Sequence, residues 1–168
     1  MSAIAPRSMT ERMIGAAKLN VGVYEEVEAD GSATGQAAGV VAIVALCSAI
    51  GGIGGGAQGV FGGLIAALLG WALWAGITYL IGDKLLGGTA TWGELLRTLG
   101  FAQAPGVLFL LGVVPLLGTV VVIIVGVWIL VTGVVAIRQA LDFGTGRAIA
   151  TALLGFIPYA LLRAFLQV

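Results

Sequence analysis

Hydrophobic and polar positions divide this chain into long apolar runs that are separated by short polar segments. No charged residue occurs from Gly31 to Gly82, or from Thr98 to Ile137. One helix needs about 20 apolar residues to cross a bilayer, so each run is long enough for two spans and a turn. A further apolar run follows Arg147. The pattern predicts an all-α integral membrane protein, with a bundle of five transmembrane helices and short amphipathic surface helices.

The turns inside the two long runs fall where the sequence is least suited to a helix. The segment from Gly54 to Gly59 is the least apolar part of the first run, and Pro115 with Gly118 interrupts the second. The predicted spans are 36–56, 60–82, 101–117, 119–137 and 148–166. They form a membrane domain over residues 36–168, after an N-terminal segment over residues 1–35.

Two capping boxes mark the starts of the predicted surface helices. Ser8 is followed three positions later by Glu11, and Thr91 is followed by Glu94, which is the spacing that satisfies the first backbone N–H groups of a helix. Apolar residues then recur at helical spacing near residues 9–19 and 92–104. Both segments are therefore expected to be amphipathic helices at the membrane surface.

The basic residues predict the orientation of the bundle, because cytoplasmic segments of membrane proteins collect Lys and Arg. Five spans with the N-terminus in the cytoplasm leave only Arg163 on the outer side. The basic residues on the inner side are then Arg7, Arg12, Lys18, Lys84, Arg97, Arg138 and Arg147. We therefore expect a multi-pass protein of the cell membrane, with a cytoplasmic N-terminus and the C-terminus outside.

Composition narrows the function. The chain is 60% hydrophobic and 10% charged, has no net charge and contains no His. A nucleic-acid partner is not expected without a basic face, and the lack of His removes the commonest acid–base and metal chemistry. No set of titratable groups converges, so neither catalysis, a metal nor a cofactor is expected.

Glycine is unusually frequent, with 28 residues, and its spacing points to helix packing. Gly51 with Gly55 and Gly52 with Gly56 stand four positions apart, which allows another helix to approach closely. Packing within the chain and docking onto another subunit are both compatible with this spacing.

Several short motifs occur in an order that one family of membrane proteins shares. They are Arg12-Met13-Ile14-Gly15-Ala16-Ala17, Tyr24-Glu25-Glu26-Val27, the segment from Gly93 to Pro105, Val114-Pro115-Leu116-Leu117-Gly118, Trp128-Ile129-Leu130, Ala136-Ile137-Arg138-Gln139-Ala140 and Arg147-Ala148-Ile149-Ala150. In this order they resemble bacterial members of the Yip-one domain family, the Ypt-interacting-protein-like membrane proteins. The resemblance implies a five-helix membrane domain with a cytoplasmic N-terminus. Eukaryotic members are partners of Rab-type GTPases, but their Asp-Leu-Tyr-Gly-Pro signature is absent here, so that role is not expected.

Three functions fit these observations. The first is a non-catalytic protein that interacts with lipid, with another membrane protein or with itself, through the two amphipathic helices. The second is a small passive transporter or channel subunit, which would depend on Gln58, Thr78, Gln103 or Thr132 at depth. The third is an accessory subunit of a larger membrane complex.

Overall fold

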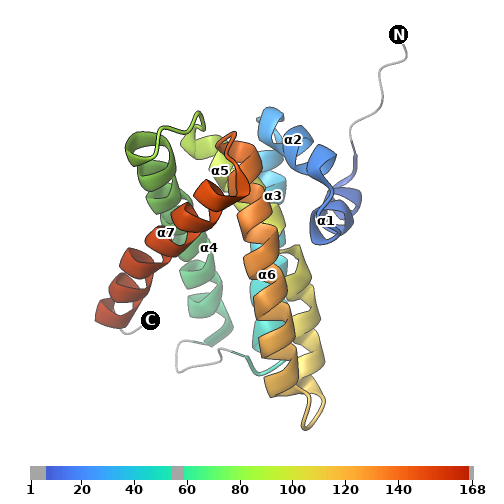
Figure 1. Cartoon of the computed structure of the whole chain (residues 1–168). Coiled ribbons are helices and arrows are strands. Elements are labelled where there is room, and N and C mark those ends of the chain that lie inside the picture. Colours follow the sequence, from blue (N-terminus) through green and yellow to red (C-terminus); the bar gives the residue numbers. More distant parts are fainter. Residues whose placement is uncertain (1–6, 54–58, 167–168) are drawn as a thin grey trace.

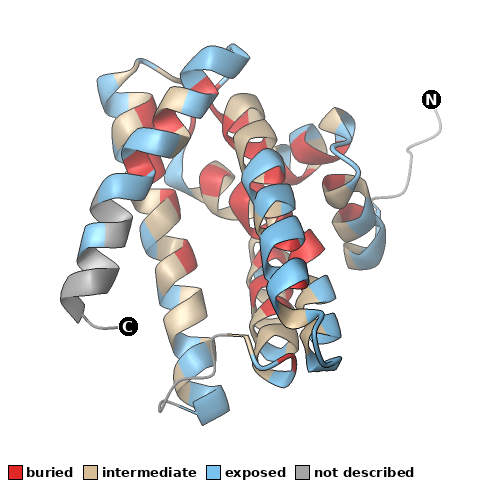
Figure 2. Cartoon of the chain, turned by 60° about the horizontal axis from the view of Figure 1, so that its bottom comes forward, coloured by how far each residue is buried: buried red, intermediate tan, exposed pale blue. Residues whose placement is uncertain are grey.

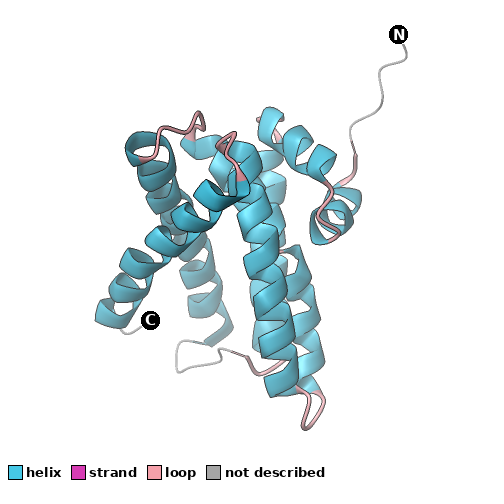
Figure 3. Ribbon diagram, in the orientation of Figure 1, coloured by secondary structure: helices cyan, strands magenta, loops and turns pink. Residues whose placement is uncertain are grey.

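The computed structural model describes residues 7–53 and 59–166, and all regular elements in this part of the chain are helices (Figure 3). In chain order they are α1 (Met9–Ala17), α2 (Val21–Ala29), α3 (Ala33–Ile50), α4 (Gly59–Tyr79), the π-helix η1 (Leu80–Leu85), α5 (Trp92–Ala102), the 3₁₀-helix η2 (Ala104–Val113), α6 (Gly118–Ala140) and α7 (Thr145–Leu166).

Within the described residues, four helical segments are long and apolar enough to cross a membrane: Ala33–Ile50, Gly59–Leu85, Trp92–Val113 and Gly118–Ala140. A shorter apolar helix covers Thr145–Ile157. Large apolar side chains such as Ile123 and Leu153 are exposed on the outer faces of these helices, where lipid would cover them (Figure 2). The predicted all-α membrane bundle is thereby confirmed.

The segment over residues 92–104 is not a surface helix, and this expectation was wrong. Its N-terminal part is α5, whose apolar residues Leu95, Leu99 and Phe101 are buried. Helix α5 contacts α3, α4 and α6, and it also contacts α1 and α2. The amphipathic pattern shows which face of the helix is apolar, but neighbouring helices cover that face. The helical segment therefore extends from Trp92 to Val113, instead of the predicted span over 101–117.

Pro105 changes the type of this helix without ending the segment. It lies in the first turn of η2, where a missing backbone N–H costs little. The chain continues as a 3₁₀-helix, which has three residues per turn and a longer rise than an α-helix. The neighbouring spans are also displaced slightly from the predicted bounds, since α6 covers 118–140 and α7 begins at Thr145.

A close parallel contact joins η2 to α3. Glycines of the α5–η2 segment recur every six residues, which is two turns of a 3₁₀-helix, and their partners on α3 recur every seven, which is about two α-helical turns. The facing pairs are Gly100 with Ala37, Gly106 with Val44, and Gly112 with Gly51. We call these six residues the glycine seam.

The glycine positions of the seam leave no room for a side chain. A Cβ atom added at Gly106 would lie 2.5 Å from Cγ1 of Val44, and one added at Gly112 would lie 2.5 Å from the carbonyl oxygen of Gly51. Both distances are shorter than real Cβ contacts. The backbones of α3 and η2 can approach this closely only because glycine occupies these positions.

The four glycines proposed for packing have different surroundings. Gly51 lies in the seam, whereas Gly52 has a φ of +70° and no atom within 4 Å of an added Cβ. Gly52 therefore serves the turn that follows α3 and packs against no helix in the described part of this chain, whereas docking of another subunit there stays a prediction. This turn also ends α3 at Ile50, before the predicted boundary at 56. Gly55 and Gly56 lie outside the described residues.

The bundle has two distinct halves (Figure 1). The polar half consists of α1, α2, η1, α5, the loops next to them, the end of α6, and the connection to α7 with the first turn of α7. The apolar half consists of η2, the turns at 51–53 and 114–117, and the adjoining parts of α3, α4 and α6. Helices α1 and α2 therefore pack onto the membrane bundle and are part of its fold.

Candidate interaction face

Charged side chains gather in the polar half. Those that the structure describes there are Arg7, Glu11, Arg12, Lys18, Glu25, Glu26, Glu28, Asp30, Asp83, Lys84, Glu94, Arg97, Arg138, Asp142 and Arg147. The described part of the apolar half contains no Asp, Glu, Lys or Arg. This one-sided distribution makes the polar half the candidate interaction face.

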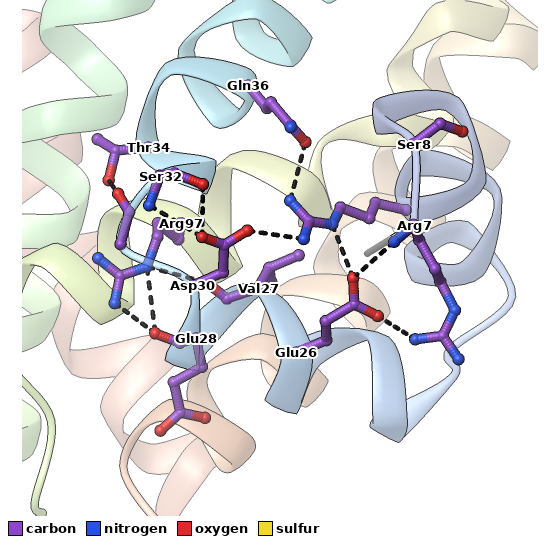
Figure 4. Close-up of polar contacts among 12 residues, drawn as sticks. Arg7, Ser8, Glu26, Val27, Glu28, Asp30, Ser32, Thr34, Gln36 and Arg97 are labelled. Carbon is purple, nitrogen blue, oxygen red and sulfur yellow. Dashed lines mark hydrogen bonds and ion pairs between the residues drawn. The ribbon is translucent and has the colours of Figure 1, made fainter. Parts of the chain in front are cut away.

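Arg12 ties the first three helices together (Figure 4). Its side chain is 1% exposed, and its guanidinium binds Glu26 at 2.9 Å and Asp30 at 2.7 Å. A third donor reaches Oε1 of Gln36 on α3 at 3.0 Å. The flat guanidinium offers donors in several directions, which a Lys ammonium cannot reproduce with the same geometry. Arg12 therefore fixes α1 against α2 and the start of α3.

Arg97 connects α5 to the end of α2. Its Nε donates to the carbonyl oxygen of Val27 at 2.9 Å, and its guanidinium also binds the carbonyl oxygen of Glu28 (Figure 4). Carbonyls in the last turn of a helix have no partner within the helix and carry partial negative charge. A cation from α5 satisfies them, so α2 is oriented by a residue far away in the sequence.

Side chains from other helices also complete the end of α1. The hydroxyl of Tyr24 donates to the carbonyl oxygen of Ala16 at 3.0 Å, and Nε1 of Trp128 donates to that of Ala17 at 2.9 Å. The sequence predicted neither of these contacts. A buried or membrane-embedded indole N–H does require an acceptor, but nothing in the sequence identifies Ala17 as that acceptor.

The carboxylates of this face have different pKa values. Hydrogen bonds and charge pairing with Arg12 and Arg7 outweigh burial and lower the pKa of Glu26. The pKa of Asp30 is lowered by the hydroxyl of Ser32 and then by Arg12. Burial, with the nearby charges of Glu94, Asp142 and Glu25, raises the pKa of Glu28 to about 7. The raised pKa of Glu28 therefore lies close to neutral pH.

Both capping boxes have the expected geometry. The backbone N–H of Glu11 donates to Oγ of Ser8 at 3.3 Å, and the N–H of Ser8 donates to the Glu11 carboxylate at 2.8 Å. The corresponding distances at Thr91 and Glu94 are 3.3 Å and 2.7 Å. The two helices differ in location, since α1 is partly exposed and α5 is packed inside the bundle.

Two polar residues within the bundle, Thr132 and Thr78, have different surroundings. The Thr132 hydroxyl donates to the carbonyl oxygen of Ala102 at 2.6 Å, at the end of α5. Thr78 is buried on α4, beside Gly155 of α7, and its hydroxyl has no hydrogen-bond partner in the described part of the chain. Gln58 lies outside the described residues. Within the described ranges, no group of His, Cys, Asp and Glu could hold a metal ion.

The structure is thus a helical membrane bundle whose charged side chains gather in one half. The model of the Yip1 domain matches residues 23–165, from α2 almost to the end of α7. The chain belongs to the Yip1 domain family. This is a family of non-enzymatic membrane proteins, so the Yip1 assignment agrees with a multi-pass membrane protein. Searches of curated proteins and of solved structures give no match.

The match begins at Val23, so α1 lies outside the Yip1 domain. Arg12 and the carbonyl oxygen of Ala17 nevertheless bind residues inside it. The candidate interaction face therefore combines the Yip1 domain with one additional helix.

Proposed function

We propose that this Yip1-domain protein acts without catalysis, by binding another membrane protein or a second copy of itself through its polar half. The observation that carries the proposal is the gathering of the described charged side chains in that half, where α1 and α2 are fixed by Arg12 and Arg97. A rigid charged surface beside the membrane suits recognition of a charged partner.

The proposed contact surface excludes most of α5, because its central residues are buried. The exposed residues Glu25 on α2, Asp142 after α6 and Thr145 at the start of α7 belong to it instead. We also propose that this surface faces the cytoplasm, that the C-terminus lies outside and that the protein resides in the cell membrane. The basic residues of the polar half support this orientation.

We further propose that the chain is a bacterial member of the family. The absence of the eukaryotic Asp-Leu-Tyr-Gly-Pro signature supports this placement.

Photo-crosslinking in intact membranes tests the binding proposal. A photoreactive amino acid at Glu25 or Thr145 should give discrete protein adducts. The matched control is the same amino acid at Ile123, which is exposed on the apolar part of α6 and should react with lipid. Lipid adducts alone from all three positions would contradict the proposal. So would solute flux in liposomes that is abolished by substituting Thr78 and Thr132, because that result would identify a transporter.

Thiol labelling tests the orientation. In a Cys47→Ala background, single cysteines at Ser32, Thr89 and Thr145 occupy exposed positions of the polar half. An impermeant reagent added to sealed cells should leave all three unlabelled and should label a cysteine at Gln167. Labelling at Thr89 or Thr145 would reverse the proposed orientation.

A further inference from the structure

Helix α1 lies on one side of the bundle, below α2 and level with the upper part of α6 (Figure 1). The carbonyl oxygen of its last residue, Ala17, is bound by Trp128, which is ten residues from Gly118 and ten from Arg138. At about 1.5 Å per residue, Trp128 is roughly 15 Å from each of these positions. At the other end of α1, Met9 lies beside Gly39, well inside α3. Helix α1 also contacts η2, which belongs to the apolar half.

The outer face of α1 mixes polar and apolar side chains. Thr10, Glu11 and Lys18 are exposed, and so is Ile14, at 51%. A charged side chain in the centre of the hydrocarbon is costly, whereas this mixture is typical of a helix in the boundary between lipid headgroups and acyl chains. The level of α1 therefore marks where that boundary meets this side of the bundle.

The carbonyl groups at the C-terminal end of α1 all accept hydrogen bonds from other groups of the protein. The last four carbonyl groups of a helix normally lack a partner within the helix. Here the carbonyl of Ile14 accepts from the N–H of Lys18, that of Gly15 from Asn20, that of Ala16 from Leu19 and Tyr24, and that of Ala17 from Trp128. Complete internal pairing is required where water is scarce, and it supports a position within the leaflet.

The two sides of the bundle then present different apolar lengths. From Gly118 to Arg138, α6 provides about 30 Å, which matches the hydrocarbon thickness of a typical bilayer. Beside α1 the apolar length from Gly118 to Trp128 is only about 15 Å. Lipids on that side must shorten their span, because a bilayer adapts to a short apolar surface by local thinning.

We propose that α1 is embedded in the leaflet on the polar side, that it thins the bilayer beside it, and that the protein prefers thin bilayers. The occupant of the outer face of α1 is lipid. This inference goes beyond the proposed function, since it needs no protein partner and can be tested with purified protein alone.

Spin labels on single cysteines measure the depth of α1. In a Cys47→Ala background, Ile14→Cys reports on α1, and Thr145→Cys is the matched control at the polar end. Collisions with oxygen indicate lipid, and collisions with a water-soluble nickel chelate indicate water. In vesicles of dimyristoleoyl phosphatidylcholine, which are thin, the label at position 14 should favour oxygen and the label at 145 should favour nickel.

Bilayer thickness and the Trp128 bond provide the decisive comparisons. In dioleoyl and then dierucoyl phosphatidylcholine, which are progressively thicker, the label at position 14 should shift from oxygen towards nickel collisions as α1 leaves its docked position. Trp128→Phe retains an aromatic ring but removes the N–H donor, so it should produce this shift already in the thinnest vesicles. Hydrogen exchange of α1 amides in the unsubstituted chain should accelerate with thickness in the same order.

Two results would overturn the inference. Equal nickel accessibility at positions 14 and 145 in the thin vesicles would place α1 in water. Low accessibility of position 14 to both reagents would show that protein, such as a second copy of the chain, covers α1. Neither result depends on the crosslinking experiment, so this inference and the proposed function can fail separately.

Discussion

The glycine seam between α3 and η2 makes a sharp prediction about Gly112. In Gly112→Ala, the new methyl group would lie 2.5 Å from the carbonyl oxygen of Gly51 and 2.8 Å from Cδ1 of Ile53. The Ile53 side chain can rotate away, but a backbone oxygen at the end of α3 cannot. The two helices must therefore separate locally to accept one methyl group.

The expected cost follows from the density of the contact. Adding a methyl group to a closely packed interior typically destabilises a protein by about 1–3 kcal/mol. We place Gly112→Ala in the upper part of this range, because the obstructing atom belongs to the backbone. In an open helix the same change has the opposite sign, since alanine favours helix by up to about 1 kcal/mol over glycine.

Gly126→Ala is the matched control for this substitution. Gly126 lies on α6, and an added Cβ there would meet no atom within 4 Å. Thermal unfolding in one mild detergent should therefore show a lower midpoint for Gly112→Ala and an unchanged or higher midpoint for Gly126→Ala. Equal effects of the two substitutions would refute the argument from close packing.

A double substitution tests the same contact from both sides. Gly106→Ala brings a methyl group 2.5 Å from Cγ1 of Val44, and Val44→Ala removes the obstructing atom. The double variant should lose less stability than the sum of the two single variants. Strict additivity would show that Gly106 and Val44 do not limit the approach of η2 to α3.

Three further predictions concern the polar half. Arg12→Met should lower the free energy of unfolding by about 3 kcal/mol, which is the lower end of the range for a broken buried ion pair. The lower end applies because Glu26 and Asp30 are partly exposed to water. Faster limited proteolysis at α1 would show that α1 has detached from the bundle. Ser8→Ala should cost about 1 kcal/mol and accelerate hydrogen exchange only in α1. Thr91→Ala should instead lower the unfolding midpoint of the whole bundle. The same effect of both variants on exchange and midpoint would contradict the different locations of α1 and α5. The raised pKa of Glu28, about 7 against 4.5 for an ordinary Glu, means that the folded state holds this proton more tightly, so stability falls as pH rises from 4.5 through 7. Glu28→Gln should reduce that fall, with no gain below pH 4.5 and the largest gain above pH 7, and a gain that is independent of pH would contradict the assignment.

The membrane bundle could be predicted from the sequence because its signals are local. Long runs without charge identify the spans, and Gly or Pro marks the turns between them. The predicted location of residues 92–104 was wrong because an amphipathic pattern does not tell whether lipid, water or protein lies against the apolar face. Leu95 and Leu99 are buried because α5 packs against helices from other parts of the chain.

The contacts of the candidate face could not be predicted for a similar reason. The capping box of Ser8 lies within four residues, and spacing alone identifies it. Arg97 and Trp128 bind carbonyl groups of α2 and α1, far away in the chain. Any backbone carbonyl can accept a hydrogen bond, so the sequence gives no information on which one is chosen.

Carbonyl groups at the ends of α1, α2 and α5 accept hydrogen bonds from side chains of other helices. Arg97 binds the last turn of α2, Thr132 binds the end of α5, and Tyr24 with Trp128 binds the end of α1. At the surface of a soluble protein, water could complete these carbonyl groups. Here side chains from neighbouring helices bind them instead, and a carbonyl group left unpaired inside the bundle or beside lipid would cost free energy.

These hydrogen bonds explain why α1 belongs to the membrane bundle although the family match begins after it. Removing α1 would leave the indole N–H of Trp128 without its acceptor, and it would separate Glu26 and Asp30 from the cation that lowers their pKa values. The rest of the chain therefore carries groups that find a partner on α1. Because those groups lie on α2, the loop before α3 and the middle of α6, the loss of α1 would affect both the polar surface and the membrane-spanning part.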